Sequence, residues 1–376
     1  MKFRSIFFTA LCGLAVSTAM TSCSDDDYDP FAGGSKVALP EHMGYILNQG
    51  SFNMNNANIV YFDWKADTLN KSSNVEHDLF YIQNGKMLGD TGQDMIMYEG
   101  SLYVVVYGSN YIVKLNRAGV EQTRKQIPTT YGQPRYIAAN DGSVYVTCLG
   151  GYVVKLSATD LAEQGKVTVG HTPEHIDIED GILYVAQGNN YDYEDTKQDN
   201  RIAIVDTKNF NDKAVEYVDV MPNTQVVVAS DNYVAVQGYG YDWTNTPLWI
   251  YNIKNKVAED TGECCTHVTK VEGSDKFFCA YSKTDWNTRE TVNTYFLYNP
   301  ATKTKEDITS TITKLDDSLS NCTLYGLSAG KDGSFYILNS FYSAGNGRYF
   351  HVYDNFQHVT VNSTWGQNPC KVVLDD

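Results

Sequence analysis

Residues 132–170 read GQPRYIAANDGSVYVTCLGGYVVKLSATDLAEQGKVTVG, and this stretch decides the fold. It contains four short runs rich in β-branched, aromatic and aliphatic residues, at 135–139, 144–148, 152–156 and 166–169. Asp–Gly and Gly–Gly pairs separate the first three runs, and such pairs end strands and turn the chain. The stretch therefore predicts a four-stranded antiparallel sheet, which is the unit of a β-propeller.

The second run of this unit recurs along the chain as an aromatic residue in an aliphatic strand. Seven copies are marked by the aromatic residues Tyr45, Tyr103, Tyr145, Tyr184, Tyr233, Phe277 and Tyr336. Neighbouring copies are 39 to 59 residues apart, which fits one propeller blade with loops of variable length. The sequence predicts an all-β protein, a seven-bladed β-propeller.

The chain ends with a strand that nothing follows. Residues 366–374 read GQNPCKVVL and match the GQP start of the unit above. The first copy, at Tyr45, lacks an inner strand before it. We therefore expect the C-terminal strand to complete blade one and close the ring, in one domain from residue 35 to 376. A β-sandwich or a two-domain β protein is the alternative.

The N-terminus has the pattern of an export signal. Lys2 and Arg4 precede an apolar run at 6–16 that is too short to span a membrane, and small residues follow it. Residues 20–23, MTSC, resemble the lipobox of bacterial lipoproteins, in which the cysteine becomes the lipid-bearing N-terminus. We expect a lipoprotein signal peptide at 1–22 and acyl chains such as palmitate on Cys23. An ordinary cleaved signal with a chance cysteine is the alternative.

An acidic segment, SDDD at 24–27, follows Cys23 directly. It resembles the signal that displays Bacteroidetes lipoproteins on the outer face of the outer membrane. We therefore expect an acidic tether at 23–34 and a lipid-anchored protein that faces outside. A solvated tether with no receptor is the alternative.

The charge of the chain excludes one class of partner. Without residues 1–22 the chain has 27 basic and 45 acidic residues, a formal charge of −18. This charge opposes binding to a phosphate backbone, because nucleic-acid affinity depends on cationic side chains. We expect no nucleic-acid partner.

Two groups of motifs resemble known families. The repeated strand, turn and VVKL strand, with GxP before the inner strand, is similar to YncE-like propellers across nearly the whole mature chain. The sequences NQGSF at 48–52 and NGKMLGD at 84–90 resemble the surface-layer-like propellers of Bacteroidetes, whose BtuG members capture cobalamin above a TonB-dependent transporter. The resemblance implies a surface lipoprotein that binds cobalamin or another corrinoid and delivers it to such a transporter. It implies no cofactor and no enzymatic step.

In a propeller, the loops between the second and third strands of the blades all lie on one face, because successive strands alternate in direction. Several of these loops, including 281–293, are long and rich in aromatic residues, Asn and Gly, which suits a large neutral ligand with amide edges. The candidate ligand-binding residues are Phe52, Asn53, Asn56, Tyr107, Tyr191, Tyr239, Tyr241, Trp243, Trp286, Phe341, Tyr342 and Arg348. The alternative is that these rings pack the loops against one another.

The cysteine and histidine patterns give one structural hypothesis and no metal site. Cys322 and Cys370 precede the inner strands of neighbouring blades, so we expect that a disulfide between them closes the ring in an oxidising compartment. His171 and His175 are four residues apart on a turn that leads into a strand, where this spacing does not bring them together. The acidic loop at 192–199 lacks the pattern of an EF-hand, and we interpret it as solvated charge, with a bound calcium ion as the alternative.

Two further function classes stay open. A glycan-binding or protein-binding platform would use the same aromatic loops. A propeller enzyme of the lyase or lactonase type would need acid–base groups that converge on the central channel, and no local motif for catalysis is present.

Overall fold

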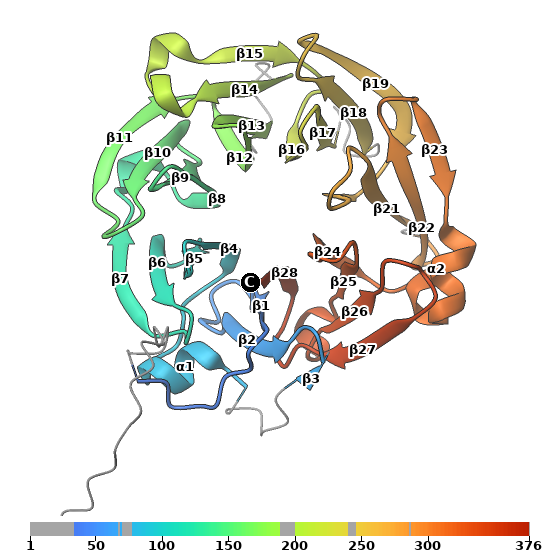
Figure 1. The fold of residues 1–376 in the computed structure, drawn as a ribbon, viewed down its shortest axis with the longest axis horizontal. Helices are drawn as coiled ribbons and strands as arrows, with labels where there is room; N and C mark the ends of the chain where they lie inside the picture. The colour runs from blue at the N-terminus through green and yellow to red at the C-terminus, as the bar shows by residue number, and fades with distance from the viewer. Residues whose placement is uncertain are drawn as a thin grey trace, which may run out of the picture.

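The computed structural model describes residues 34–66, 68–69, 77–188, 200–239, 246–285 and 287–375. These residues form seven four-stranded antiparallel sheets that surround a central axis as the blades of a propeller (Figure 1). In six blades the strands follow chain order from the axis outward. The predicted all-β, seven-bladed fold is confirmed, and the alternative of a sandwich or two β-domains is excluded.

The blades are numbered in chain order. The strands of blades one to three are β28 (Pro369–Leu374), β1 (Met43–Asn48), β2 (Asn58–Asp63) and β3 (Thr68–Leu69); β4 (Gly92–Tyr98), β5 (Ser101–Val106), β6 (Tyr111–Asn116) and β7 (Glu121–Gln126); and β8 (Pro134–Asn140), β9 (Ser143–Cys148), β10 (Tyr152–Ser157) and β11 (Glu163–Thr168). Those of blades four and five are β12 (Thr172–Glu179), β13 (Ile182–Gly188), β14 (Arg201–Asp206) and β15 (Glu216–Asp219); and β16 (Thr224–Ala229), β17 (Tyr233–Gly238), β18 (Pro247–Asn252) and β19 (Val257–Cys264). Those of blades six and seven are β20 (His267–Lys270), β21 (Phe277–Asp285), β22 (Glu290–Asn299) and β23 (Thr304–Asp307); and β24 (Leu324–Ala329), β25 (Phe335–Asn339), β26 (Arg348–Val352) and β27 (Val359–Ser363).

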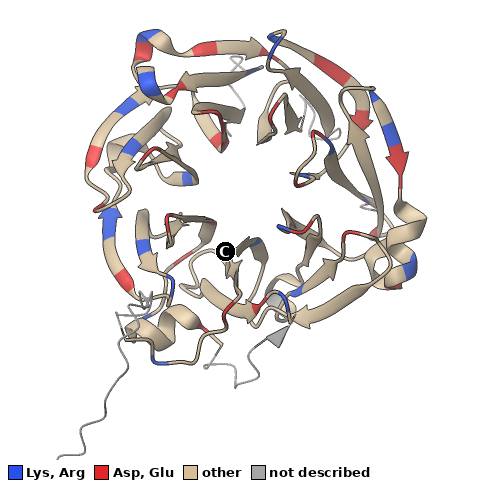
Figure 2. Ribbon diagram, viewed as in Figure 1, with Lys and Arg blue, Asp and Glu red and all other residues tan. Residues whose placement is uncertain are grey.

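The burial of each strand follows its place in the blade. Every residue of β5 and β9, the second strands of blades two and three, is buried, because both faces of these strands pack on neighbouring blades. The outermost strand β7 instead alternates between exposed and half-buried residues. Lys, Arg, Asp and Glu are frequent on the outermost strands (Figure 2). The aliphatic second strand that repeats in the sequence is therefore the core strand of each blade.

The ring closes as the sequence predicts. Strand β28 pairs antiparallel with β1, in the register Gly44 with Leu374 and Ile46 with Val372. The side chain of Asn48 supports this seam by donating a 2.8 Å hydrogen bond to the carbonyl oxygen of Thr364. The first and last strands of the domain therefore share one blade, which removes two open sheet edges.

Buried tyrosines link one blade to the next. The hydroxyl of Tyr45 in blade one donates a 2.6 Å hydrogen bond to the carbonyl oxygen of Arg117 in blade two. The hydroxyl of Tyr103 in blade two donates a bond of the same length to Ala158 in blade three. A tyrosine fills the space between sheets with its ring and satisfies a turn carbonyl with its hydroxyl, which accounts for part of the 28 tyrosines of the chain.

Short insertions and one long hairpin depart from the regular blade. Helix α1 (Leu79–Asn84) lies between β3 and β4, and α2 (Thr309–Leu315) lies between β23 and β24. The loop expected at 281–293 is instead mostly strand, because β21 and β22 pair as far as Asp285 and Glu290. The hydroxyls of Thr284 and Thr291 lie 3.0 Å apart across this pair, and alternating Thr and Val suit a strand. Among the described helices, none is long and apolar enough to cross a membrane.

Candidate functional site

The face that bears the connections between second and third strands, here called the loop face, gathers exposed apolar side chains. Ten large hydrophobic residues of the described chain are exposed, and seven of them lie on the loop face or beside it: Phe52, Met54, Tyr81, Met87, Val292, Phe341 and Tyr342. The other three lie on outermost strands. Of the predicted residues, Cys23, Tyr191, Tyr241, Trp243 and Trp286 lie outside the described residues.

Three of the predicted residues form one cluster in blade seven. Phe341 is 41% exposed and Tyr342 is 58% exposed. The guanidinium of Arg348, at the start of β26, lies 5.2 Å from the centre of the Phe341 ring. The hydroxyl of Ser340 fixes the turn by accepting a 2.7 Å hydrogen bond from the amide of Tyr342. The cluster presents two rings and one cation to solvent.

The blade-one loop presents Phe52 but uses its amides internally. Phe52 is 62% exposed. The amide N–H of Asn53 lies 3.0 Å from both carboxylate oxygens of Asp90. The side chain of Asn56 accepts a 2.8 Å bond from Ser51 N–H and donates a 3.0 Å bond to Gln367. Asn56 was expected to bond a ligand, whereas here both ends of its amide hold the loop in shape.

The remaining predicted residues, Tyr107 and Tyr239, are half-buried. The ring of Tyr107 lies 5.0 Å from the guanidinium of Arg135. The amide of Tyr239 donates a 3.2 Å bond to the carbonyl of Asn223. Tyr107 therefore packs toward the central channel and is not part of the exposed cluster in blade seven.

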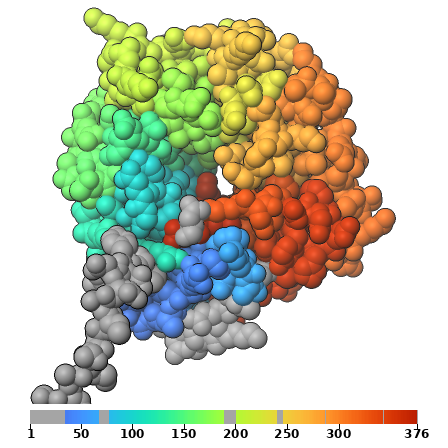
Figure 3. Space-filling model, viewed as in Figure 1, coloured from blue at the N-terminus to red at the C-terminus, as the bar shows by residue number. Residues whose placement is uncertain are grey.

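The central channel is a second candidate site. It is a cavity of about 540 Å³ lined by the inner strands of all seven blades, and Figure 3 shows its opening at the centre of the ring. In six blades the pairing of the inner strand with its neighbour shifts by one residue near the start of the strand. Such a β-bulge turns a side chain out of the regular alternation, and bulges are common beside functional sites. The residues at these bulges are Gln93, Arg135 with Tyr136, Glu174 with His175, Gln225, Tyr325 and Cys370.

Several bulge residues form a chain of hydrogen bonds around the channel. The hydroxyl of Tyr325 donates to the side-chain oxygen of Gln49, whose amide nitrogen lies 3.4 Å from the Gln93 oxygen. Arg135 donates a 2.9 Å bond to the same Gln93 oxygen and forms a 2.7 Å ion pair with Glu174. Burial raises the pKa of Glu174, and the Arg135 guanidinium offsets part of that rise. This belt joins blades seven, one, two, three and four.

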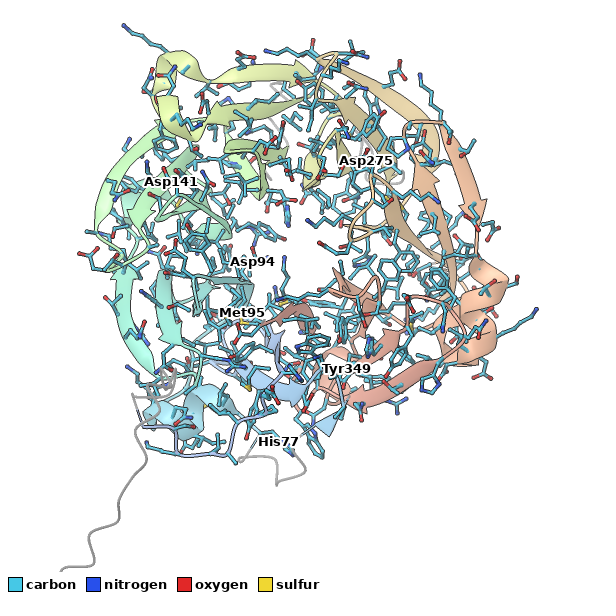
Figure 4. The ribbon with its side chains drawn as sticks, viewed as in Figure 1. His77, Asp94, Met95, Asp141, Asp275 and Tyr349 are labelled. Carbon is cyan, nitrogen blue, oxygen red and sulfur yellow. The ribbon has the colours of Figure 1, made fainter. Side chains whose placement is uncertain are left out.

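A second layer of the channel wall carries an acid, a cation and an imidazole. Lys371 lies 3.4 Å from the Asp94 carboxylate, which Figure 4 places at the edge of the channel. Burial lowers the pKa of His175, and Lys371 lowers it further. Nδ1 of this ring has no hydrogen-bond partner among the described residues. Burial opposes the charge of Lys371, but Asp94 and Asp177 hold its pKa above the usual value. A neutral base and a fixed cation therefore face one cavity.

The sequence analysis did not identify this channel set. It considered His175 only as a partner of His171, which lies exposed outside the strand. The sequence does mark these positions, because the bulge residues directly follow the proline that begins the inner strand in blades three and four.

The structure does not contain the disulfide expected between Cys322 and Cys370. Both are free cysteines. The sulfur of Cys322 lies 3.6 Å from the amide nitrogen of Asn293, whereas that of Cys370 lies 3.5 Å from the carbonyl oxygens of Leu47 and Gly92. The two side chains pack in different clusters of the core, so adjacency of the blades does not bring them together. Among the described residues, no group of three or more His, Cys, Asp or Glu is placed to hold a metal ion.

Comparisons with known proteins give the fold alone. No protein-family profile and no curated protein matches the chain. A putative 6-phosphogluconolactonase from Bacteroides fragilis is similar in structure, with a TM-score of 0.60, 10% identity, and 89% of this chain and 98% of that one covered. Kuenenia stuttgartiensis hydrazine synthase has a TM-score of 0.54, 14% identity, and coverage of 69% and 76%. U3-55K has a TM-score of 0.53, 8% identity, and coverage of 76% and 83%. These likenesses do not confirm the resemblance to YncE-like or BtuG proteins.

Proposed function

We propose that this protein is a surface lipoprotein that captures a nutrient ligand, cobalamin or another corrinoid, on its loop face and delivers it to a TonB-dependent outer-membrane transporter. The observation that carries the proposal is the one-sided distribution of exposed apolar side chains. Seven of the ten in the described chain lie on or beside the loop face. A surface that gathers most of the exposed apolar side chains of a domain is typical of a binding site.

The loops that would form the site are held in shape before any ligand arrives. Gln367 and Asp90 brace the loop that presents Phe52, and Ser340 braces the turn that presents Tyr342. Such bracing lowers the entropy lost on binding, so more of the contact energy contributes to affinity. Phe341 and Tyr342 would supply ring contacts to the corrin, and Arg348 would bond the amide or phosphate groups of the ligand.

Titration of the purified protein with cyanocobalamin tests this proposal. We expect one-to-one binding with heat release in calorimetry and a change in the visible absorbance of the corrinoid. Absence of both signals at micromolar concentrations would reject a corrinoid ligand. A glycan or protein ligand for the same face would then be the next candidate, tested by glycan-array binding.

The channel supports a second candidate, catalysis by a propeller enzyme. The observation that favours it is the unpartnered Nδ1 of His175 in the same cavity as Lys371 and Asp94. A neutral imidazole can accept a proton, and an ammonium group can stabilise a developing negative charge. The Bacteroides fragilis protein is named a putative lactonase, so a lactone is a reasonable first substrate, although a 10% identical neighbour gives the fold alone.

The test of this second candidate is turnover of a panel of lactones by the wild type and by His175→Gln. Catalysis in the channel predicts turnover that is lost in His175→Gln and kept in the matched control His171→Gln, because His171 is exposed outside the channel. Turnover that persists in His175→Gln would reject this assignment.

A further inference from the structure

A pocket of about 470 Å³ lies at the seam where the ring closes. We call it the seam pocket. It is bounded by the loop before β2, by helix α1 and by the connection from blade seven to β28. The residues that matter for its chemistry are Asn56, Asp78, Tyr81, Met87, Trp365 and Gln367. In Figure 4, His77, which stacks on Trp365, marks this region at the outer rim of the ring.

Among the described residues that line the seam pocket, Asp78 carries the one charge. No Lys, Arg or His is among the residues that line the described pocket, and Asp78 is its one carboxylate. Asp78 is 6% exposed, and no ion pair of the described chain reaches it. Burial raises the pKa of its carboxyl group to about 6, although the backbone N–H groups of Tyr81, Ile59 and Phe80 favour the charged form. The N–H of Tyr81 donates a 3.0 Å bond to this carboxylate. A buried carboxylate without a counter-charge is unfavourable, and a bound cation would offset that cost.

The oxygen atoms of the pocket do not suit a metal ion. Oδ1 of Asn56 accepts a bond from Ser51 N–H. Oε1 of Gln367 accepts two bonds, from the Ser51 hydroxyl at 2.8 Å and from the Asn56 amide at 3.0 Å. Oδ1 of Asn58 accepts a bond from Asn48. A calcium ion needs six to eight oxygen ligands, and three of the four lining side-chain amide oxygens are already engaged. The cation that fits is therefore an organic one.

The rest of the lining suits the carbon groups of such a cation. Tyr81 is 39% exposed and Met87 is 42% exposed. The indole of Trp365 is held against His77 with 4.4 Å between ring centres and 7° between planes, so its position is fixed. Aromatic faces attract alkylammonium groups through their negative electrostatic potential, and a thioether adapts its shape to apolar groups.

We propose that the seam pocket binds an organic ammonium ion, with its charge against Asp78 and its alkyl groups against Trp365, Tyr81 and Met87. The side-chain amide nitrogen of Gln367 is a remaining hydrogen-bond donor for an acceptor atom elsewhere on the ligand, because its oxygen already takes two donors. The site adjoins the blade-seven loop through Asn346 and shares the exposed residues Tyr81 and Met87 with the loop face. Its charge and its fixed ring come from Asp78 and Trp365, which the function proposed above does not use.

Fluorine NMR tests the proposal with choline and its uncharged isostere 3,3-dimethylbutan-1-ol. The purified protein carries 5-fluorotryptophan at its five tryptophans, and the Trp365 signal is assigned with the variant Trp365→Phe. We expect choline to shift the Trp365 signal and the alcohol to bind at least about tenfold more weakly, since it has the same shape but no charge. n-Butylammonium and n-butanol form a second pair that tests a primary amine. Equal binding of charged and neutral partners in both pairs, or no binding by either cation, would overturn the proposal.

The variant Asp78→Asn separates charge from shape. Asn keeps the acceptor oxygen that bonds the N–H of Tyr81 and is as good a helix cap as Asp, so the fold should persist. We expect choline affinity to fall at least about tenfold while the circular dichroism spectrum is unchanged. The matched control is Asp141→Asn, an exposed turn residue between β8 and β9 on the opposite face, labelled in Figure 4, whose backbone φ of 48° Asn tolerates. Unchanged affinity in Asp78→Asn, or an equal loss in Asp141→Asn, would contradict the assignment.

Discussion

The guanidinium of Arg135, on the inner strand of blade three, lies 2.7 Å from the carboxylate of Glu174 on the inner strand of blade four. Both residues lie at β-bulges near the start of their strands. Arg135 also stacks near Tyr107 and Tyr136 and bonds Gln93, so one side chain connects blades two, three and four. The ring is thus held together at its centre by polar contacts as well as by apolar packing between blades.

Glu174→Ala should lower the free energy of unfolding by about 1–3 kcal/mol, because it removes the charged acceptor of the half-buried Arg135 guanidinium, which keeps its bond to Gln93. The double variant Arg135→Met with Glu174→Leu should lose less, since it leaves no unpaired charge. Chemical denaturation followed by circular dichroism measures both values. A double variant that is less stable than Glu174→Ala would show that the pair contributes more than compensation of charge.

Phe341→Ala and Tyr342→Ala should each weaken ligand binding by about 1–3 kcal/mol, if these rings are central contacts of the loop face. Both side chains are exposed, so the melting temperature should stay the same. Calorimetric titration with cyanocobalamin measures the effect. Tyr217→Ala on the outermost strand β15 is the control, because Tyr217 is similarly exposed but far from the loop face. Equal effects in all three variants would argue against the proposed location.

Tyr103→Phe should cost about 1 kcal/mol of stability, because it leaves the buried carbonyl of Ala158 without its hydrogen bond. Tyr152→Phe is a suitable control, since the Tyr152 hydroxyl makes no hydrogen bond within the described chain. Thermal denaturation of the two variants gives the comparison. A similar loss in Tyr152→Phe would mean that the effect comes from the ring and not from the link between blades.

Asp78 should make stability depend on pH. Its folded pKa of about 6 lies above the ordinary aspartate value of 3.8, so its contribution to stability is complete below pH 4 and is lost as pH rises through 6. Asp78→Asn removes this titration, and the variant should gain up to about 3 kcal/mol over the wild type at pH 7 but little at pH 4. Urea denaturation at several pH values measures the difference. A constant difference between pH 4 and 7 would contradict the raised pKa.

Much of the fold could be predicted because its signals are local. The strand at 144–148 and the turns on either side of it are set by neighbouring residues, and β9 spans Ser143–Cys148. The outermost strand of the same blade was placed too late, at 166–169, because its alternation is weak; it spans Glu163–Thr168. The hairpin of β21 and β22 was missed because its polar Thr and Asn residues resemble those of a loop.

The candidate sites were less predictable because they depend on distant residues. Phe341 and Tyr342 could be placed on one face from strand direction alone. The partner of Asn56 is Gln367, more than 300 residues further along the chain, and no sequence spacing indicates that their side chains meet. For Cys322 and Cys370 the sequence instead predicted a contact that the structure does not contain. The two residues belong to neighbouring blades, but their side chains pack in different clusters of the core.

The sequence by itself determined the number of blades and the closure of the ring, because each blade repeats a local pattern of turn, aromatic residue and aliphatic strand, and the last strand has only one vacant place to fill. Only the tertiary structure decided which polar side chains share a cavity. His175, Lys371 and Asp94 come from three blades, and Asp78 and Trp365 come from opposite ends of the domain. Their chemistry arises from burial and proximity, which depend on how the blades pack and not on the order of residues along the chain.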